Sequence, residues 1–160
     1  MIEVSFYQLT GRSVESALLA LLERSRGRGW RAVVQAASMS RLKKIDEYLW
    51  SYRRESFFPH GGASDPDPVS QPVYLTCEDN DNPNDAEIRF FVEGVALAPV
   101  LDGAAAPTIR AAILFDGADL AELEDARAQW RELRDAGYEL VYYQQNEEGK
   151  WIEKAREPKP

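Results

Sequence analysis

The N-terminal part of the chain changes its hydrophobic period twice, and this order of patterns constrains the fold more than any other feature. Residues 2–9 (IEVSFYQL) have the composition of a strand, and residues 13–29 have the spacing of a helix, with Ser13 as its N-cap and glycines at its end. Residues 30–37 (WRAVVQAA) again resemble a strand. A strand, a helix and a strand at these lengths predict a right-handed βαβ unit with parallel strands.

The remaining sequence continues the same alternation. Strands are predicted at residues 73–79, 87–94, 109–117 and 139–145, and helices from Ser40 and from Asp119 to Gly137. No internal repeat or linker separates two cores. We therefore expect one α/β domain over residues 1–150, a three-layer α-β-α arrangement with a mainly parallel sheet, followed by a charged, partly frayed tail at residues 151–160.

Charge is distributed unevenly along the chain. The formal net charge is −8 over 160 residues, yet residues 1–54 contain ten Lys or Arg against five Asp or Glu. An overall acidic protein is a poor non-specific binder of nucleic acid, so direct binding of single-stranded DNA by the basic N-terminal third is disfavoured. Local basic patches are still able to bind a short acidic peptide. With neither a basic leader nor an apolar run of membrane-spanning length, we expect a cytoplasmic protein.

The sequence contains no convincing set of catalytic residues. The turn at residues 8–16 contains one glycine and lacks the dinucleotide and P-loop patterns. A single histidine, His60, and a single cysteine, Cys77, argue against a zinc site, and the acidic run from Glu78 to Glu87 lacks the spacing of a calcium loop. We expect no metal, no cofactor and no catalytic residue. The alternative is a small α/β enzyme of unknown substrate that uses His60.

One candidate interaction surface surrounds Trp50. Apolar residues recur at intervals of three and four between Leu42 and Tyr52, which predicts a buried helical face. Trp50 lies roughly 130° from the centre of that face. With Phe57 and Phe58 nearby, an exposed Trp50 would form a patch large enough to bind a partner. The alternative is that the helix ends before Trp50 and the ring joins the core.

The second candidate surface lies on the long helix. Arg127, Arg131 and Arg134 follow at intervals of four and three residues, so they form one stripe, with Trp130 beside it. Arginines next to an aromatic ring suit a ligand that has both carboxylates and an apolar group. The alternative is that the arginines pair with neighbouring carboxylates and that Trp130 belongs to the core.

Three segments resemble one known family. They are VSFYQL at the N-terminus, DEYLW followed by ESFFPH at residues 46–60, and ARAQWRELRDAGYEL at residues 126–140. Together they are similar to the chi subunit of bacterial DNA polymerase III, an accessory protein of the clamp-loader assembly. The resemblance implies a fold like the nucleotide-binding domains of helicases without the phosphate loop.

The resemblance also implies a bridging role without catalysis. In the chi family one surface binds the psi subunit or, instead, a helicase, and Trp50 and Phe57 stand at the matching positions. Another surface binds the acidic, Phe-ended C-terminal tail of the single-stranded DNA-binding protein, and Arg127, Trp130 and Arg131 stand there. Trp and Arg replace a Tyr and a Lys that a family member can have, which keeps a ring and a cation.

Overall fold

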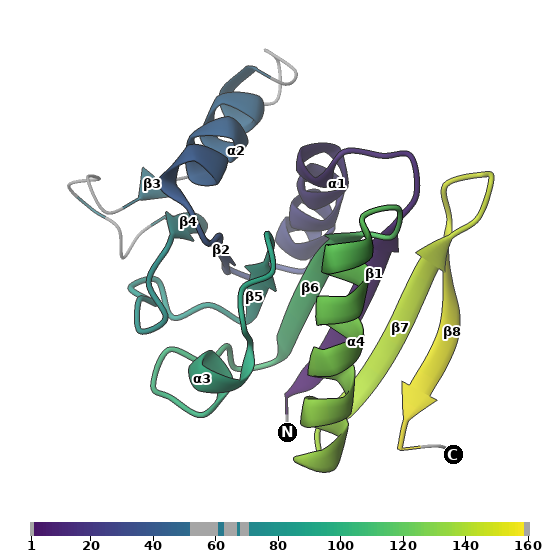
Figure 1. Cartoon of the computed structure of the whole chain (residues 1–160). Helices are drawn as coiled ribbons and strands as arrows, with labels where there is room; N and C mark the ends of the chain where they lie inside the picture. Colours follow the sequence, from purple (N-terminus) through teal and green to yellow (C-terminus); the bar gives the residue numbers. More distant parts are fainter. Residues whose placement is uncertain (1, 52–60, 63–66, 68–70, 159–160) are drawn as a thin grey trace.

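Eight strands form a single sheet in the computed structural model, which describes residues 2–51, 61–62, 67 and 71–158. In sequence order the strands are β1 (Glu3–Leu9), β2 (Ala32–Gln35), β3 (Gly61–Gly62), β4 (Val73–Thr76), β5 (Ile88–Phe91), β6 (Arg110–Asp116), β7 (Glu139–Gln145) and β8 (Trp151–Glu157). Their order across the sheet is β3-β4-β2-β5-β6-β1-β7-β8. All neighbours are parallel except β7 and β8, so the prediction of a mainly parallel sheet is confirmed (Figure 1).

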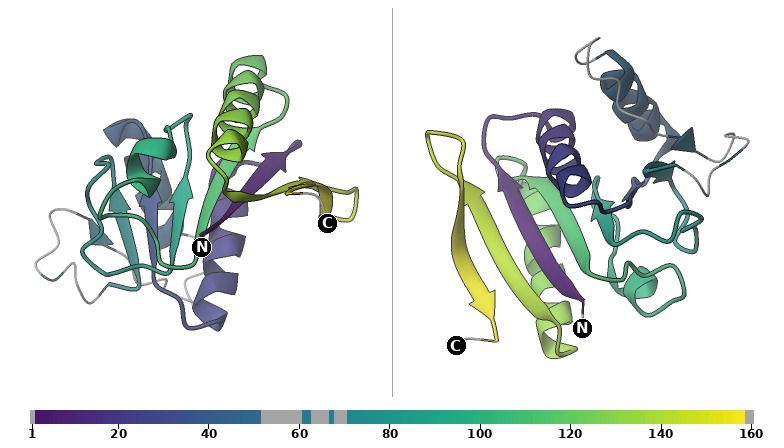
Figure 2. Two further views of the ribbon diagram at one scale, coloured as in Figure 1. Left: turned by 90° about the horizontal axis from the view of Figure 1, so that it is seen from below. Right: turned by 180° about the vertical axis from the view of Figure 1, so that it is seen from behind.

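Helices cover both faces of this sheet. They are α1 (Val14–Gly27), α2 (Met39–Ser51), α3 (Ala98–Leu101) and α4 (Leu120–Asp135). Residues of α1 and α2 pack in one core cluster and residues of α3 and α4 in the other, and Figure 2 shows α1 and α4 on opposite faces of the sheet, so the predicted α/β architecture is confirmed. The strands β1 and β2 that flank α1 are parallel, as expected, but β6 and β5 lie between them.

The two-residue period of the strands divides the core into two layers. In β1, Val4 and Phe6 pack in the cluster that contains α3 and α4, whereas Tyr7 and Leu9 pack in the cluster that contains α1 and α2. Strand β6 has buried residues on both faces, as its continuous apolar run predicted.

The predicted helix cap at Ser13 is present, and the structure adds a second cap at Asp119. The Ser13 side chain accepts a hydrogen bond from the Ser16 amide at 3.1 Å, and the Asp119 side chain accepts one from the Glu122 amide at 3.2 Å. Each cap satisfies an amide that has no partner within its helix. The caps therefore fix where α1 and α4 begin relative to the sheet.

The acidic segment from Glu78 to Glu87 folds over a buried arginine. Arg89 is fully buried in β5. Its guanidinium donates to the Gln35 side-chain oxygen at 2.6 and 3.1 Å, to the Asp81 carbonyl at 2.7 Å and to the Glu78 carbonyl at 2.9 Å. Burial lowers the pKa of Arg89 to about 10, although Asp81 and Asp79 oppose this shift. The segment is thus held to the sheet through its backbone.

At the C-terminal end, residues 151–157 belong to the segment expected to be a charged, partly frayed tail. These residues form β8, which pairs with β7 in the antiparallel direction. Asn146 closes the connecting turn, because its side-chain oxygen accepts hydrogen bonds from the Glu148 and Lys150 amides at 2.9 Å. Backbone pairing and the contact of Trp151 with Tyr7 outweigh the charged composition of the segment.

Among the described residues, no helix has the length and apolar composition needed to cross a membrane.

Candidate functional site

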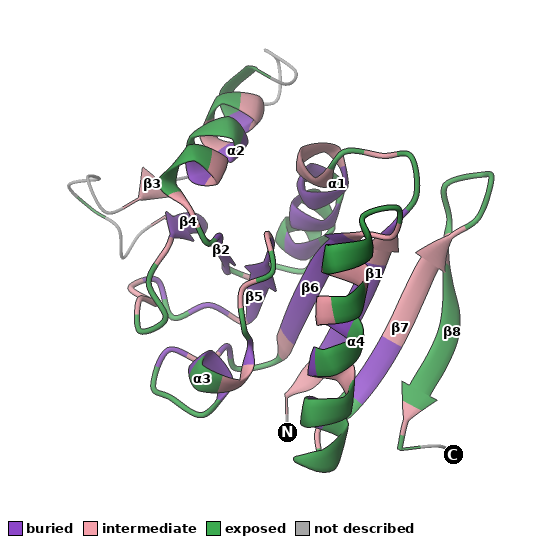
Figure 3. Cartoon of the chain, viewed as in Figure 1, coloured by how far each residue is buried: buried purple, intermediate pink, exposed green. Residues whose placement is uncertain are grey.

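A pocket of about 400 Å³ lies between α4 and the outer strands of the sheet. Figure 3 shows that β8, at this edge of the sheet, is largely exposed. The lining residues come from β1, α4, β7 and β8, and they are Gln8, Leu123, Arg127, Trp130, Arg131, Tyr142, Gln144 and Ala155. Three of them are the residues singled out on the long helix.

Trp130 forms one wall of the pocket and is half-buried. Its ring packs edge-to-face on Phe6 at 5.2 Å and on Tyr142 at 5.7 Å between ring centroids. Such contacts contribute about 0.5–1.5 kcal/mol per pair and hold the ring in one orientation. One part of the Trp130 ring therefore packs against the core cluster and another borders the pocket.

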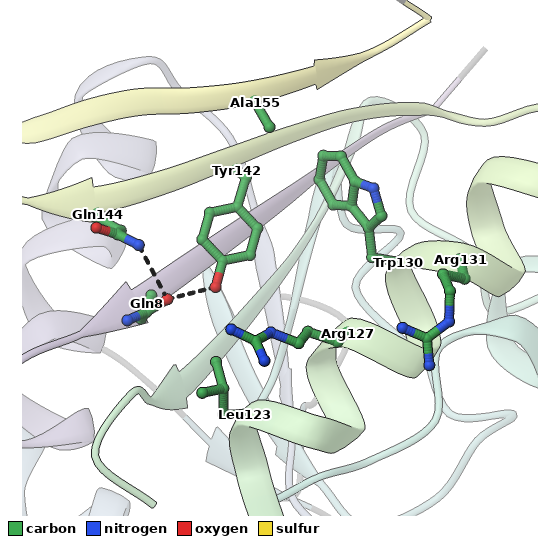
Figure 4. Close-up of a pocket in the computed structure, with 8 residues that line it drawn as sticks. All are labelled: Gln8, Leu123, Arg127, Trp130, Arg131, Tyr142, Gln144 and Ala155. Atoms are coloured by element: carbon green, nitrogen blue, oxygen red, sulfur yellow. Dashed lines mark hydrogen bonds between the residues drawn. The ribbon is translucent and has the colours of Figure 1, made fainter. Parts of the chain in front are cut away.

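The arginines of the stripe differ in their partners. Arg134 pairs with Asp135 at 3.3 Å, as the alternative interpretation expected for the whole stripe. Arg127 and Arg131 are exposed and, within the part of the chain that the structure describes, form no ion pair. Figure 4 shows Arg127 extended toward the Tyr142 hydroxyl group. The pocket thus presents two guanidinium groups to solvent.

The floor of the pocket is a small polar network between neighbouring strands. The Tyr142 hydroxyl group and the Gln144 amide both donate to the Gln8 side-chain oxygen, the latter at 3.2 Å (Figure 4). Burial raises the pKa of Tyr142, while Arg127 lowers it, so the phenol remains a neutral donor. Gly117 leaves the space that this network needs, because a Cβ there would lie 2.4 Å from the Gln8 amide nitrogen.

The other predicted surface is described only in part. Helix α2 continues through Trp50 to Ser51, and the Trp50 side chain is 54% exposed. Leu42, Ile45 and Leu49 are buried, so the predicted phase of the helix is confirmed. Phe57, which was expected to lie beside Trp50, and His60, the candidate base, fall outside the described residues.

The described residues contain no group of three or more His, Cys, Asp or Glu side chains able to hold a metal ion. Cys77 is half-buried beside Met39, and burial together with Glu78 and Glu93 raises the pKa of its thiol.

Comparison with known proteins decides the family. The family model for the DNA polymerase III chi subunit, HolC, matches residues 1–141. The chain belongs to the DNA polymerase III chi subunit family. A relative described as a probable DNA polymerase III subunit chi, from Rickettsia prowazekii (strain Madrid E), is 30% identical over 101 residues. That alignment covers 63% of this chain and spans 61% of the length of the relative.

In this chi-family chain, sequence reasoning missed the strand residues of the pocket. Gln8 and Gln144 stand near the carboxyl ends of two neighbouring parallel strands, which is where α/β sheets usually place ligand-binding residues. That rule would have identified both glutamines. Ala155 could not be found in this way, because it lies in the segment expected to be frayed.

Proposed function

We propose that this chi-family chain is a non-catalytic accessory subunit in DNA replication. In this role it connects two partners. One is the DNA polymerase III complex, including its clamp loader, and the other is single-stranded DNA-binding protein. The pocket at Arg127, Trp130 and Arg131 binds the acidic C-terminal tail of that protein. The observation that carries the proposal is the convergence of two exposed arginines and an aromatic wall in one pocket.

The chemistry of the pocket fits an acidic peptide that ends in phenylalanine. Guanidinium groups bind carboxylates through paired, charge-assisted hydrogen bonds, so Arg127 and Arg131 suit the acidic side chains and the terminal carboxylate. Trp130 and Leu123 offer apolar surface for a phenyl ring. The amides of Gln8 and Gln144 border the same space and are able to bond the peptide backbone.

Calorimetric titration with a synthetic peptide that ends in Asp and Phe residues tests this proposal. We expect binding at low salt that weakens as salt rises, since the screening length falls from about 30 Å at 0.01 M to about 8 Å at 0.15 M. Arg127→Ala and Arg131→Ala should each weaken binding about tenfold, roughly 1.4 kcal/mol. A peptide amidated at its C-terminus is the control for the terminal carboxylate. No heat of binding at low salt would exclude the tail site.

We propose that the Trp50 surface, with Phe57, binds the psi subunit or a helicase. Large exposed aromatic residues are frequent anchors of protein interfaces, and α2 carries Trp50 away from the buried face of the helix. The pocket at Arg127, Trp130 and Arg131, here called the tail pocket, is on α4. It lies on the opposite face of the sheet from α2. The two surfaces are therefore able to act independently.

Replacement of Trp50 by alanine separates the two surfaces. Loss of an interface anchor costs about 2 kcal/mol or more, so capture of psi or the helicase from host lysate should fall at least about thirtyfold. Binding of the acidic peptide should not change. The measurement is a parallel pull-down and peptide titration with wild type, Trp50→Ala and Arg131→Ala. Equal capture by wild type and Trp50→Ala would remove Trp50 from the interface.

A further inference from the structure

A second pocket, of about 560 Å³, lies on the other face of the same strands, between α1 and the β7–β8 hairpin. Five of its lining residues carry positive charge and none carries negative charge. The lining residues are Tyr7, Arg12, Ala20, Arg24, Arg28, Arg110, Tyr143, Gly149, Lys150 and Trp151. In a chain whose net charge is −8, this is a marked local concentration of cations.

The cations come from three separate parts of the sequence. Arg24 lies in the last turn of α1 and Arg28 is its C-cap residue, Arg110 begins β6, and Lys150 lies in the hairpin. Arg28 and Arg110 lie 5.0 and 5.4 Å from the ring centroid of Trp30, which restrains both guanidinium groups. Arg110 also faces Glu3 at 3.7 Å. The remaining charge at the pocket therefore stays strongly positive.

Aromatic residues form the floor between these cations. Tyr143 stacks on Tyr7 at 5.1 Å, and Trp151 packs edge-to-face on Tyr7 at 4.9 Å between ring centroids. Tyr7 is buried, whereas Tyr143 and Trp151 are half-buried and line the pocket. The pocket thus offers fixed aromatic surface within a ring of positive charge.

The two pockets are separated by the sheet itself. Neighbouring residues of a strand point to opposite faces of the sheet. Tyr142 and Gln144 therefore line the tail pocket, while Tyr143 lines the second pocket with its five cations, here called the cationic pocket. In β1 the same holds for Gln8 and Tyr7. A ligand in one pocket does not occupy the other.

We infer that the cationic pocket binds single-stranded DNA directly, a function that goes beyond the proposed binding of the protein tail. Guanidinium groups pair with phosphates, and aromatic side chains stack with bases whatever their sequence, which is the usual combination in proteins that bind single strands. A strand of DNA carries one phosphate per nucleotide, so several of its phosphates are able to contact the cations that α1, its flanking residues, β6 and the hairpin bring to the pocket. This inference departs from the expectation drawn from the acidic net charge, because the structure gathers five cations in one place and a local field of this kind attracts phosphates.

Two arginines in the last turn of α1 provide a matched test. Arg24 and Arg26 are both exposed, but only Arg24 lines the pocket. Fluorescence anisotropy with labelled oligo(dT) at low salt should show binding by wild type and by Arg26→Ala. Arg24→Ala should bind about threefold more weakly or worse, and its slope of log affinity against log salt should be shallower by about 0.7. Lys150→Ala should weaken the affinity for oligo(dT) as Arg24→Ala does. Lys154 lies in β8 outside the pocket, so Lys154→Ala is the matched control for Lys150→Ala.

Equal affinities for Arg24→Ala and Arg26→Ala, or no binding by wild type at low salt, would overturn the inference. Polyglutamate, added at the same concentration of negative charges as oligo(dT), provides another test. If it displaced oligo(dT), the pocket would recognise anions of any kind and the inference would be overturned. Charge reversal at Arg127 and Arg131 should leave oligo(dT) binding unchanged, whereas Arg24→Ala should leave binding of the acidic peptide unchanged. Failure of either proposal is therefore distinguishable from failure of the other.

Discussion

Arg89→Ala is expected to lower the free energy of unfolding by about 3–5 kcal/mol. The substitution removes a fully buried side chain and leaves the Glu78 and Asp81 carbonyl groups without their donor. It also removes both hydrogen bonds to the Gln35 side chain. Because the acidic segment is attached through these carbonyls, its amides should exchange faster with solvent. Urea unfolding and hydrogen exchange measure the two effects.

Two variants control this experiment. Arg89→Met keeps much of the side-chain volume without the donors, so it should recover the part of the loss that comes from the cavity. Arg131→Ala changes an exposed arginine and should alter the free energy of unfolding by no more than about 0.5 kcal/mol. A loss below about 1 kcal/mol for Arg89→Ala would show that water replaces the guanidinium at little cost.

Charge reversal at both pocket arginines should abolish binding of the acidic tail peptide. In the double variant Arg127→Glu and Arg131→Glu, two attractive contacts become two like-charge contacts on the rim of the pocket. Like charges brought together at an interface cost several kcal/mol, so affinity should fall at least about a hundredfold, roughly 2.7 kcal/mol. Calorimetry at low salt measures the loss, and the effect should shrink as salt increases.

Arg134→Glu is the matched control for this pair. Arg134 belongs to the same stripe of α4 and is exposed, but it pairs with Asp135 and does not line the pocket. We expect less than about a threefold change in affinity, because only the long-range field alters. If Arg134→Glu weakened binding as much as the double variant does, the peptide would respond to the overall charge of the helix and not to the pocket.

The local features of the fold were predictable because they depend on residues close in sequence. The cap at Ser13, the start of α4 near Asp119, the buried face of α2 and the buried run of β6 all follow from residue periodicity and side-chain chemistry. The same reasoning located Arg127, Trp130 and Arg131, since spacing alone places them on one side of a helix. The strand at residues 151–157 is harder to predict from its charged composition, because a charged edge strand forms only when its partner strand is available.

By itself, the sequence determined a three-layer α/β chain of the chi family, with an aromatic residue outside the buried face of one helix and an arginine stripe on another. Only the tertiary structure decided which residues share a pocket. Parallel strands brought Gln8 next to Tyr142 and Gln144, and the antiparallel strand β8 added Ala155. Likewise, three distant segments supplied the cations around Tyr7. Such contacts depend on strand order and register, which are set by packing of the whole core and not by local propensity.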